Sequence, residues 1–252
     1  MKSITKPDHM GRRIAAIIRH GDYQQIADSP SALQPYPLNV KGEQQAATAA
    51  TTIEQLLLEN QWQLVPTIDS SQQLRGWQSA HIILTALSAN GQQNLQIESF
   101  DALAERSTGA AANLTTAQIR TVIENDPRYP ELPQGWKSDS RFRLPLQGAE
   151  SLLEAGLRVA RHLSQRLSTL PIQEQEQEQE QEQEQDQLKL FVGHGAAFRH
   201  AAYHLGVLKF SQIAKLSMYH CTPILLEQQS DDCWRQIGGE WKIRNAGSEY
   251  RD

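Results

Sequence analysis

The sequence predicts an α/β fold, a three-layer sandwich with a mostly parallel central sheet and helices on both faces. Short apolar runs typical of buried strands alternate with longer segments whose apolar residues recur at helical spacing. Strands that alternate with helices in this way are typical of a parallel sheet. The 252 residues suffice for one domain with a full core, and no linker rich in Pro, Gly and Ser divides them near the middle. We therefore expect a single domain over residues 1–252.

The first half of the chain is expected to supply three strands and two helices. The strands are expected at residues 14–18, 64–70 and 95–100, and the helices at about 43–59 and 74–89. A polar loop rich in Pro and Ser, residues 28–37, follows the first strand. The second helix is indicated by Ala80, Ile83 and Leu87, which recur at helical spacing.

Residues 101–147 are expected to form an irregular, lid-like insertion. The segment is rich in Pro, Gly and Trp, and so long a segment without regular structure inside a compact domain usually has a function. The motif Gly148-Ala149-Glu150-Ser151 then precedes an amphipathic helix that runs to about residue 170. A Gln/Glu repeat at residues 173–187 has no apolar face to bury, so we expect an exposed, low-complexity loop.

The end of the chain is expected to complete the sheet. An apolar run predicts a strand at residues 188–192, and a helix is expected to follow it at 196–205. A final pair of strands is expected at 218–228 and 233–238. Because the helix at 196–205 begins where the strand at 188–192 ends, its positive N-terminus points at that strand end.

Composition and charge exclude several classes of protein. The net charge of −5 derives from residues 173–187, which hold six Glu and one Asp and no Lys or Arg. Removing these seven from 29 acidic residues leaves 22 against 24 basic ones, and no basic stripe suggests nucleic-acid binding. No apolar run approaches the ~20 residues of a membrane span, and the polar start lacks the apolar stretch of a signal peptide. With Cys221 and Cys233 interpreted as reduced thiols, we expect a cytoplasmic protein.

Two histidines are expected at the carboxyl ends of strands, where ligands bind in open α/β sheets. Arg19-His20-Gly21 directly follows the first strand, and Gly193-His194-Gly195 follows the strand at 188–192. A neutral imidazole nitrogen can attack phosphorus at neutral pH, and a neighbouring guanidinium group both disfavours the imidazolium and binds phosphoryl oxygens. The glycines beside His194 allow a ligand to approach closely.

Two more polar residues have positions that suit phosphate chemistry. Arg75 follows the second strand and opens a helix, where the helix-terminal amides also favour an anion. Glu105 lies in Leu103-Ala104-Glu105-Arg106 after the third strand. A carboxylic acid near a bound phosphate can protonate the leaving oxygen and later deprotonate the attacking water.

In chain order, these motifs resemble the histidine phosphatase superfamily, in the branch that includes cofactor-dependent phosphoglycerate mutases and many phosphatases. Arg19-His20-Gly21 is similar to its first motif and Val192-Gly193-His194-Gly195 to its second histidine motif. The matching elements between them are Leu38-Asn39-Val40-Lys41-Gly42-Glu43-Gln44-Gln45-Ala46, Arg75-Gly76-Trp77-Gln78-Ser79-Ala80, Leu103-Ala104-Glu105-Arg106 and Gly148-Ala149-Glu150-Ser151.

The resemblance implies a phosphoglycerate mutase-like fold and a phosphatase that works through a phosphohistidine. The implied site residues are the catalytic His20, Glu105 and His194 and the phosphate-binding Arg19, Arg75 and Gly195. The expected substrate is a phosphorylated small molecule or a phosphoprotein, and the chemistry requires no metal or cofactor. His200 and His204 lie four residues apart on one helix, but without a carboxylate in sequence reach we do not interpret them as a metal site.

Departures from the mutase pattern favour hydrolysis over isomerisation. Asp22 follows the first motif where mutases and many phosphatases carry Glu, and the tandem arginines that help mutases hold a second acid group are missing. Lys137, Arg141 and Arg143 are scattered in their place. Without those contacts, water takes the phosphoryl group more readily. Two alternatives remain open, namely a phosphoglycerate mutase-type phosphoryl transfer and a non-catalytic binding protein on this fold.

Overall fold

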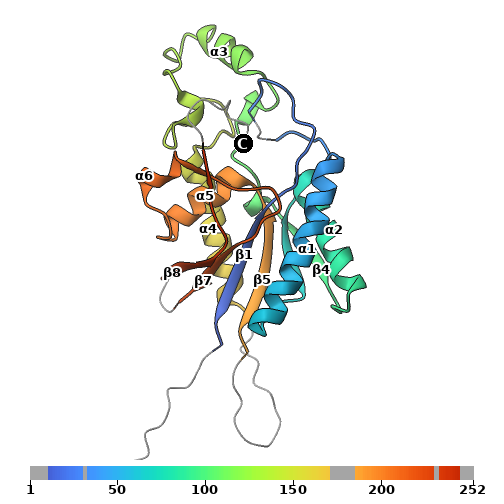
Figure 1. The fold of residues 1–252 in the computed structure, drawn as a ribbon. Helices are drawn as coiled ribbons and strands as arrows, with labels where there is room; N and C mark the ends of the chain where they lie inside the picture. The colour runs from blue at the N-terminus through green and yellow to red at the C-terminus, as the bar shows by residue number, and fades with distance from the viewer. Residues whose placement is uncertain (1–10, 31–32, 171–184, 230–232, 245–252) are drawn as a thin grey trace, which may run out of the picture.

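A computed structural model describes residues 11–30, 33–170, 185–229 and 233–244 (Figure 1). Within these residues seven strands form one sheet in the order β4-β3-β5-β1-β7-β8, with β2 also paired to β5. Strands β1 to β5 run parallel, β7 is antiparallel to β1, and β8 is antiparallel to β7. The bounds are β1 (Arg13–Arg19), β2 (Gln63–Leu64), β3 (Thr67–Ser71), β4 (Gln96–Phe100), β5 (Gln187–Gly193), β7 (Ile224–Gln228) and β8 (Trp234–Gly238). The mostly parallel sheet is therefore confirmed.

Helices cover both faces of this sheet, which confirms the three-layer fold (Figure 1). Their bounds are α1 (Val40–Asn60), α2 (Leu74–Ala89), α3 (Thr116–Glu124), α4 (Leu152–Ser168), α5 (Gly195–His204) and α6 (Phe210–Ile213). Along β1, Ile14, Ala16 and Ile18 pack with residues of α1 and α2, whereas Ala15 and Ile17 pack with residues of α4 and α5. A strand buried on both faces needs apolar residues at every position, so its sequence shows no alternation.

Two element boundaries differ from the prediction for local reasons. The strand expected at 64–70 is divided into β2 and β3 at Pro66, which has no N–H to donate to a neighbouring strand. Helix α1 begins at Val40 instead of residue 43, because the Asn39 side chain accepts a hydrogen bond from Gly42 N and caps the helix.

The strand expected at 218–228 is wrong in its first part. Only Ile224–Gln228 joins the sheet, while β6 (Leu216–Ser217) pairs with β9 (Lys242–Ile243). The chain between them turns across the end of β1, where Cys221 N donates to Arg19 O at 2.8 Å. This turn also places His220 beside Arg19.

The insertion at 101–147 is more regular than expected. It contains α3, which a capping box between Thr115 and Gln118 initiates, and the short 3-10 turns Asp101–Leu103, Gly109–Ala111 and Trp136–Ser138. Its apolar side chains form a small separate core with Ala149, and the members from the insertion are Ala111, Ile119, Ile123, Leu132, Trp136 and Leu144. Figure 1 shows α3 beyond the carboxyl ends of the parallel strands. Of the predicted Gln/Glu loop, residues 173–184 lie outside the described residues, and Gln187 begins β5.

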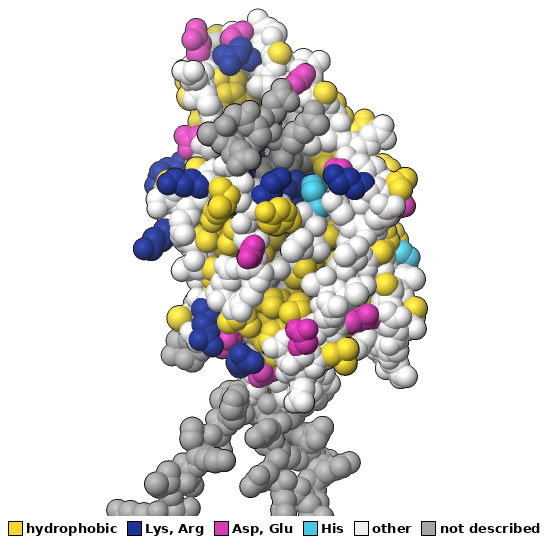
Figure 2. All heavy atoms as spheres, in the orientation of Figure 1, with side chains coloured by type: hydrophobic (Ala, Val, Ile, Leu, Met, Phe, Trp, Pro, Cys, Tyr) yellow, Lys and Arg dark blue, Asp and Glu magenta, His cyan; other side chains and the backbone are white. Residues whose placement is uncertain are grey.

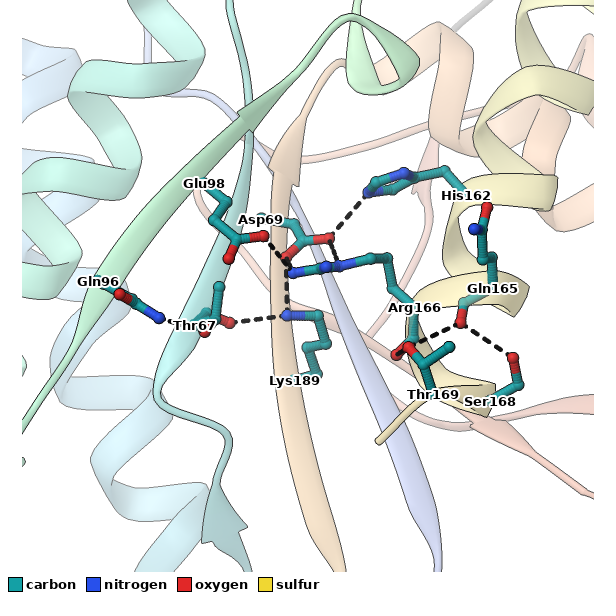
Figure 3. Close-up of polar contacts among 10 residues, drawn as sticks. All are labelled: Thr67, Asp69, Gln96, Glu98, His162, Gln165, Arg166, Ser168, Thr169 and Lys189. Carbon is teal, nitrogen blue, oxygen red and sulfur yellow. Dashed lines mark hydrogen bonds and ion pairs between the residues drawn. The ribbon is translucent and has the colours of Figure 1, made fainter. Parts of the chain in front are cut away.

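A buried charge cluster joins the middle of the sheet to α4 (Figure 3). Lys189 on β5 and Asp69 on β3 form an ion pair of 2.7 Å, and Asp69 also accepts hydrogen bonds from His162 and Arg166 of α4, both at 2.8 Å. Arg166 in turn donates to Glu98 of β4 at 2.6 Å. Burial alone would raise the pKa of Asp69, but hydrogen bonds from His162 and Arg166 outweigh it and hold that pKa below its usual value. Each charge in the cluster is therefore compensated.

Candidate active site

The candidate site lies where β1, β3 and β5 end. Arg19 is the last residue of β1, Ser71 of β3 and Gly193 of β5. Parallel strands end at the same edge, and a hydrogen bond of 2.9 Å from His20 N to Gly193 O ties two of these ends together. The first and second histidine motifs, 174 residues apart in number, thereby meet, and their ring centroids lie 5.0 Å apart.

The hydrogen bonds of His20 fix the position of its ring proton. Nδ1 lies 2.7 Å from Gly21 O, and because a carbonyl can only accept, Nδ1 carries the hydrogen. Nε2 therefore holds the lone pair, and it accepts a hydrogen bond of 3.2 Å from Arg75 Nε. The nitrogen that could attack phosphorus is thus unprotonated and beside a guanidinium group.

Arg75 connects both histidines. Besides its contact with His20, it donates from Nη1 to Gln34 O at 2.8 Å and from Nη2 to His194 Nδ1 at 3.3 Å. The Tyr23 ring lies 4.6 Å from its guanidinium carbon. Its side chain is fully buried, so its orientation is set by these contacts rather than by solvent.

His194 has the opposite tautomer from His20. Its Nδ1 accepts from Arg75, so Nε2 carries the hydrogen and donates to Ser71 Oγ at 2.9 Å. Burial first, and then the positive charges of Arg75 and Arg19, lower the pKa of both His20 and His194 well below the usual value. Both rings are therefore neutral at neutral pH, as nucleophilic attack by His20 requires.

Close contacts between backbones hold the loop after β1 in place. A Cβ atom on Gly21 would lie 2.4 Å from Gly42 O, so only glycine permits this approach of the loop to α1. A Cβ atom on Gly195 would lie 2.9 Å from Arg19 Cδ. Arg19 occupies this space and donates from Nη1 to Met218 O at 3.0 Å. The structure therefore brings Arg19 and Gly195 into contact.

Glu105 is buried, and its Oε1 accepts a hydrogen bond of 2.9 Å from Arg106 N. Burial lowers the pKa of Arg75, and the charges of Tyr23 and Glu105 act against that effect, so Glu105 lies within electrostatic reach of Arg75. The structure thus associates Glu105 with the two-histidine site through Arg75.

An ion pair anchors the segment that holds Glu105. Arg158 Nη1 donates to the carbonyl oxygens of Asp101, Ala102 and Ala104, at 3.0, 2.9 and 3.2 Å. On the other side of Glu105, Glu150 Oε2 accepts from Ser107 N at 3.1 Å and from Arg158 Nη2 at 2.8 Å. The Gly148-Ala149-Glu150-Ser151 motif therefore contributes a carboxylate that fixes the chain around Glu105.

Sequence reasoning missed several residues of the site. Ser71 could have been expected, because it ends a strand of the parallel sheet. Gln34 has no sequence signal, since it contributes a backbone oxygen. His220 arrives through the unpredicted turn, donates from Nδ1 to His20 O at 2.7 Å, and lies 5.6 Å from the His20 ring centroid. Burial and then Arg19 lower the pKa of His220 to about 4.

The paired histidines of α5 contact other groups. His200 donates from Nδ1 to Ala196 O at 2.7 Å and accepts from Ser140 Oγ at 2.9 Å, while His204 donates to Leu153 O at 2.9 Å. Among the residues that the structure describes, no three His, Cys, Asp or Glu side chains are grouped to hold a metal ion. Nor does any helix in this part of the chain combine the length and the apolar character needed to cross a membrane.

Comparisons with known proteins identify a matching family and solved structures with a similar fold. The model of the histidine phosphatase superfamily (branch 1) matches residues 15–236. A mycobacterial glucosyl-3-phosphoglycerate phosphatase has a similar structure, with 20% identity, a TM-score of 0.62, and coverage of 90% of this chain and 97% of that chain. The alpha-ribazole phosphatase of Shigella flexneri is 14% identical with a TM-score of 0.60, covering 92% of this chain and 96% of that one. No curated protein matches the chain in sequence. At these identities the solved structures show a shared fold.

Proposed function

The chain belongs to the histidine phosphatase superfamily, and from this premise we propose that it hydrolyses a phosphomonoester through a phosphohistidine on His20. One observation carries the proposal: the unprotonated Nε2 of His20 lies 3.2 Å from Arg75 Nε, in a buried site that keeps the ring neutral. A neutral nitrogen beside buried guanidinium groups suits attack on a phosphate dianion, whose oxygens those groups bind.

In the first step, the lone pair of His20 Nε2 forms a bond to phosphorus while the ester P–O bond breaks. The carboxylic acid of Glu105 gives its proton to the leaving oxygen, so the alcohol departs neutral. Arg19, Arg75 and His194 stabilise the phosphoryl oxygens. The bond from His20 Nδ1 to Gly21 O stabilises the positive charge that the ring gains on phosphorylation.

In the second step, water attacks phosphorus and the bond between phosphorus and Nε2 breaks. The carboxylate of Glu105 takes a proton from the water, which restores the acid for the next cycle. Inorganic phosphate then leaves, and His20 returns to its neutral form. The two steps consume one ester and one water and release one alcohol and one phosphate.

A phosphatase screen over a panel of phosphorylated metabolites and a phosphopeptide tests this function. We expect phosphate release by the wild type and none above background by His20→Ala. His81→Ala is the matched control, because His81 is an exposed histidine of α2 that stacks on Trp77 away from the site. Phosphohistidine is stable to alkali and labile to acid. During turnover of a labelled substrate, we therefore expect a covalent phosphate label on the protein after alkaline quenching and none after acid quenching. Equal activity of His20→Ala and the wild type would refute the mechanism.

The mutase alternative is tested on the same protein. With 3-phosphoglycerate and trace 2,3-bisphosphoglycerate, we expect release of phosphate. Isomerisation without phosphate release would instead show a mutase, and it would mean that the missing tandem arginines are not needed to protect the phosphoenzyme from water.

A further inference from the structure

We propose that a cavity under the carboxyl end of α4 binds a free α-amino acid with an apolar side chain. We call this cavity the α4 pocket, and its walls include Leu64, Val65, Pro66, Glu98, Arg166 and Leu170. Thr67, which begins β3, and Gln187, which begins β5, also line it, so it lies at the amino ends of these strands. The candidate active site lies beyond their carboxyl ends. A ligand in the α4 pocket therefore binds without His20, and its binding does not depend on the proposed function.

The α4 pocket has the size and the walls of a small-molecule site. Its volume is about 380 Å³, and such sites typically enclose about 300–1,000 Å³. They combine mostly apolar walls with a few polar groups that orient the ligand. Leu64, Val65, Pro66 and Leu170 supply the apolar walls of this pocket, and the charged side chains lie on β4, β5 and α4. A ligand with one apolar end and one polar end matches this division. Figure 2 shows the surface of one face of the molecule, where apolar and charged side chains likewise lie side by side.

Arg166 and Glu98 present two opposite charges side by side in the α4 pocket (Figure 3). Arg166 Nη2 donates to Glu98 Oε2 at 2.6 Å, and the bonds from Arg166 to Asp69 use Nε and Nη2. Arg166 Nη1 and Glu98 Oε1 therefore have no hydrogen-bond partner among the described residues. The two side chains are 28% and 43% exposed, so a ligand can reach them. The pair thus offers one donor group and one acceptor atom next to each other.

The charges around the α4 pocket favour a ligand with no net charge. Lys189 forms an ion pair of 2.7 Å with Asp69 and donates to Thr67 O at 2.8 Å. Together with Arg166 and Glu98, two cations therefore face two anions. Charges in a partly buried site are only weakly screened, so a lone anion or a lone cation would upset this balance. A molecule that carries both a carboxylate and an ammonium group preserves it.

A free α-amino acid carries both of these groups on one carbon atom. Its carboxylate can accept from Arg166 Nη1 while its ammonium group donates to Glu98 Oε1, each in a charge-assisted hydrogen bond. An apolar side chain on the same carbon then lies against the apolar walls. A peptide does not match, because the amino and carboxyl groups of a residue within it are joined in uncharged amides. The α4 pocket therefore suits the free amino acid.

Isothermal titration calorimetry with L-leucine and three truncated probes tests which groups are recognised. Glycine lacks the apolar side chain, 4-methylpentanoate lacks the ammonium group, and 3-methylbutylamine lacks the carboxylate. We expect L-leucine to bind at least about tenfold more tightly than each of them, since each loses a charge-assisted hydrogen bond or the burial of an apolar side chain. Failure of L-leucine to bind, or a smaller advantage over any one probe, would overturn the proposal.

Two variants place the binding in the α4 pocket. Glu98→Gln exchanges a charged acceptor for a neutral group, so the affinity for L-leucine should fall at least about fivefold, whereas that for 4-methylpentanoate should not fall. Thr169→Trp keeps all four charges but fills the pocket from an exposed position at the end of α4, and it should abolish the binding of L-leucine. Glu124→Gln is the control, because Glu124 is an exposed glutamate of α3 outside the pocket and its exchange changes the net charge equally.

His20→Ala separates the α4 pocket from the candidate active site. This variant should bind L-leucine as the wild type does, and inorganic phosphate should not displace L-leucine from either protein. Loss of binding in His20→Ala would place the ligand at the candidate active site and overturn the proposal, as would unchanged binding in Glu98→Gln or Thr169→Trp. A wild type that binds L-leucine but hydrolyses no phosphoester would refute the proposed function and leave the α4 pocket supported.

Discussion

At the scale of single residues, three histidines meet at the end of β1 in an environment that keeps them neutral. His20, His194 and His220 lie close together, and burial lowers the pKa of each. The first two share Arg75 as a hydrogen-bond partner, and the third donates to the backbone of the first. Neighbouring atoms therefore determine which ring nitrogen carries the proton, and the rings do not take up a second proton over the neutral pH range.

This arrangement predicts the pH dependence of activity. Because the pKa of His20 lies well below 6.5, this proposed nucleophile stays neutral as the pH falls to that value, and the acid limb of kcat/KM attributable to His20 should lie below pH 6.5. Arg75→Gln removes a charge that lowers this pKa and should move it upward. Titration of the ring resonances by NMR in both proteins measures the shift directly. A His20 ring that titrates near pH 6.5 in the wild type would contradict the prediction.

Some residues of the site could be predicted from the sequence, and others could not. His20, Arg75 and His194 each follow a strand of a parallel sheet, so the topology alone predicts that they meet, and their hydrogen bonds show that they do. Their catalytic roles, and that of Glu105, stay predictions. Gln34 contributes only a carbonyl oxygen, which every residue has, so no sequence pattern could single it out.

At the scale of secondary-structure elements, α4 has two tasks. Through His162 and Arg166 it holds the charge cluster under β3, and through Arg158 it holds the segment before Glu105. Gly156 allows α5 to pack closely on it, because a Cβ atom there would lie 2.4 Å from His200 Cβ. The helix thus connects the stability of the sheet to the geometry of the site.

Arg158→Met should impair proton donation by releasing the segment that holds Glu105. Loss of an aligned proton donor slows esters with poor leaving groups, typically by about 100-fold or more, but hardly affects esters whose leaving group is stable as an anion. Because the variant displaces the donor only in part, we expect kcat for an alkyl phosphate to fall at least about tenfold. The kcat for p-nitrophenyl phosphate should change less than about twofold. Arg161→Met, an exposed cation on the same helix, is the control. Equal losses on both substrates would indicate a general structural defect instead.

Lys189→Met should destabilise the fold because it leaves Asp69 buried with one cation fewer. Removing one partner of a buried ion pair typically lowers the free energy of unfolding by about 3–5 kcal/mol, and the remaining bonds from His162 and Arg166 place our expectation at the lower end. Urea unfolding at pH 7 measures it. The double variant Lys189→Met with Asp69→Leu should recover part of the loss, since it removes the uncompensated charge. A single variant as stable as the wild type would refute the role of this pair.

Strands and helices could be predicted from the sequence where an element is buried along its whole length. They were missed where the apolar pattern is short. Strands β1 and β5 are buried on both faces, so their continuous apolar runs identify them to within about one residue at each end. Helix α3 has two fully buried residues, Ile119 and Ile123, in nine, too few to distinguish it from a loop. The turn at 218–223 was missed because its conformation depends on contacts with β1 that are distant in sequence.

At the scale of the whole molecule, the three histidines couple stability to pH. Their pKa in the folded state lies below that in the unfolded chain, so the unfolded chain binds more protons as the pH falls below about 6.5, and stability falls with it. With a folded pKa of about 4, His220 alone accounts for a loss of up to about 2 kcal/mol between pH 7 and pH 5. The lowered pKa of Asp69 acts only below about pH 4, outside this window.

His220→Asn should therefore flatten the pH dependence of stability. We expect the difference in the free energy of unfolding between pH 7 and pH 5 to shrink by up to about 2 kcal/mol in this variant. Denaturant unfolding at both pH values provides the measurement, and the exposed His81→Asn should behave as the wild type. An unchanged difference in His220→Asn would show that this histidine does not resist protonation in the folded protein.

The topology of the sheet places both ends of one connection away from the candidate site. Leu170 and Gln185, the described residues on either side of residues 171–184, flank the amino end of β5, whereas His194 follows its carboxyl end. We expect a Gly/Ser linker of equal length in place of residues 173–184 to leave kcat/KM within about twofold, because both described ends of this connection lie at the opposite end of β5 from His194. A tenfold loss would disprove this. An unchanged kcat/KM would make residues 173–184 a place where the gene can gain or lose repeats, or accept a reporter, without selection acting through catalysis.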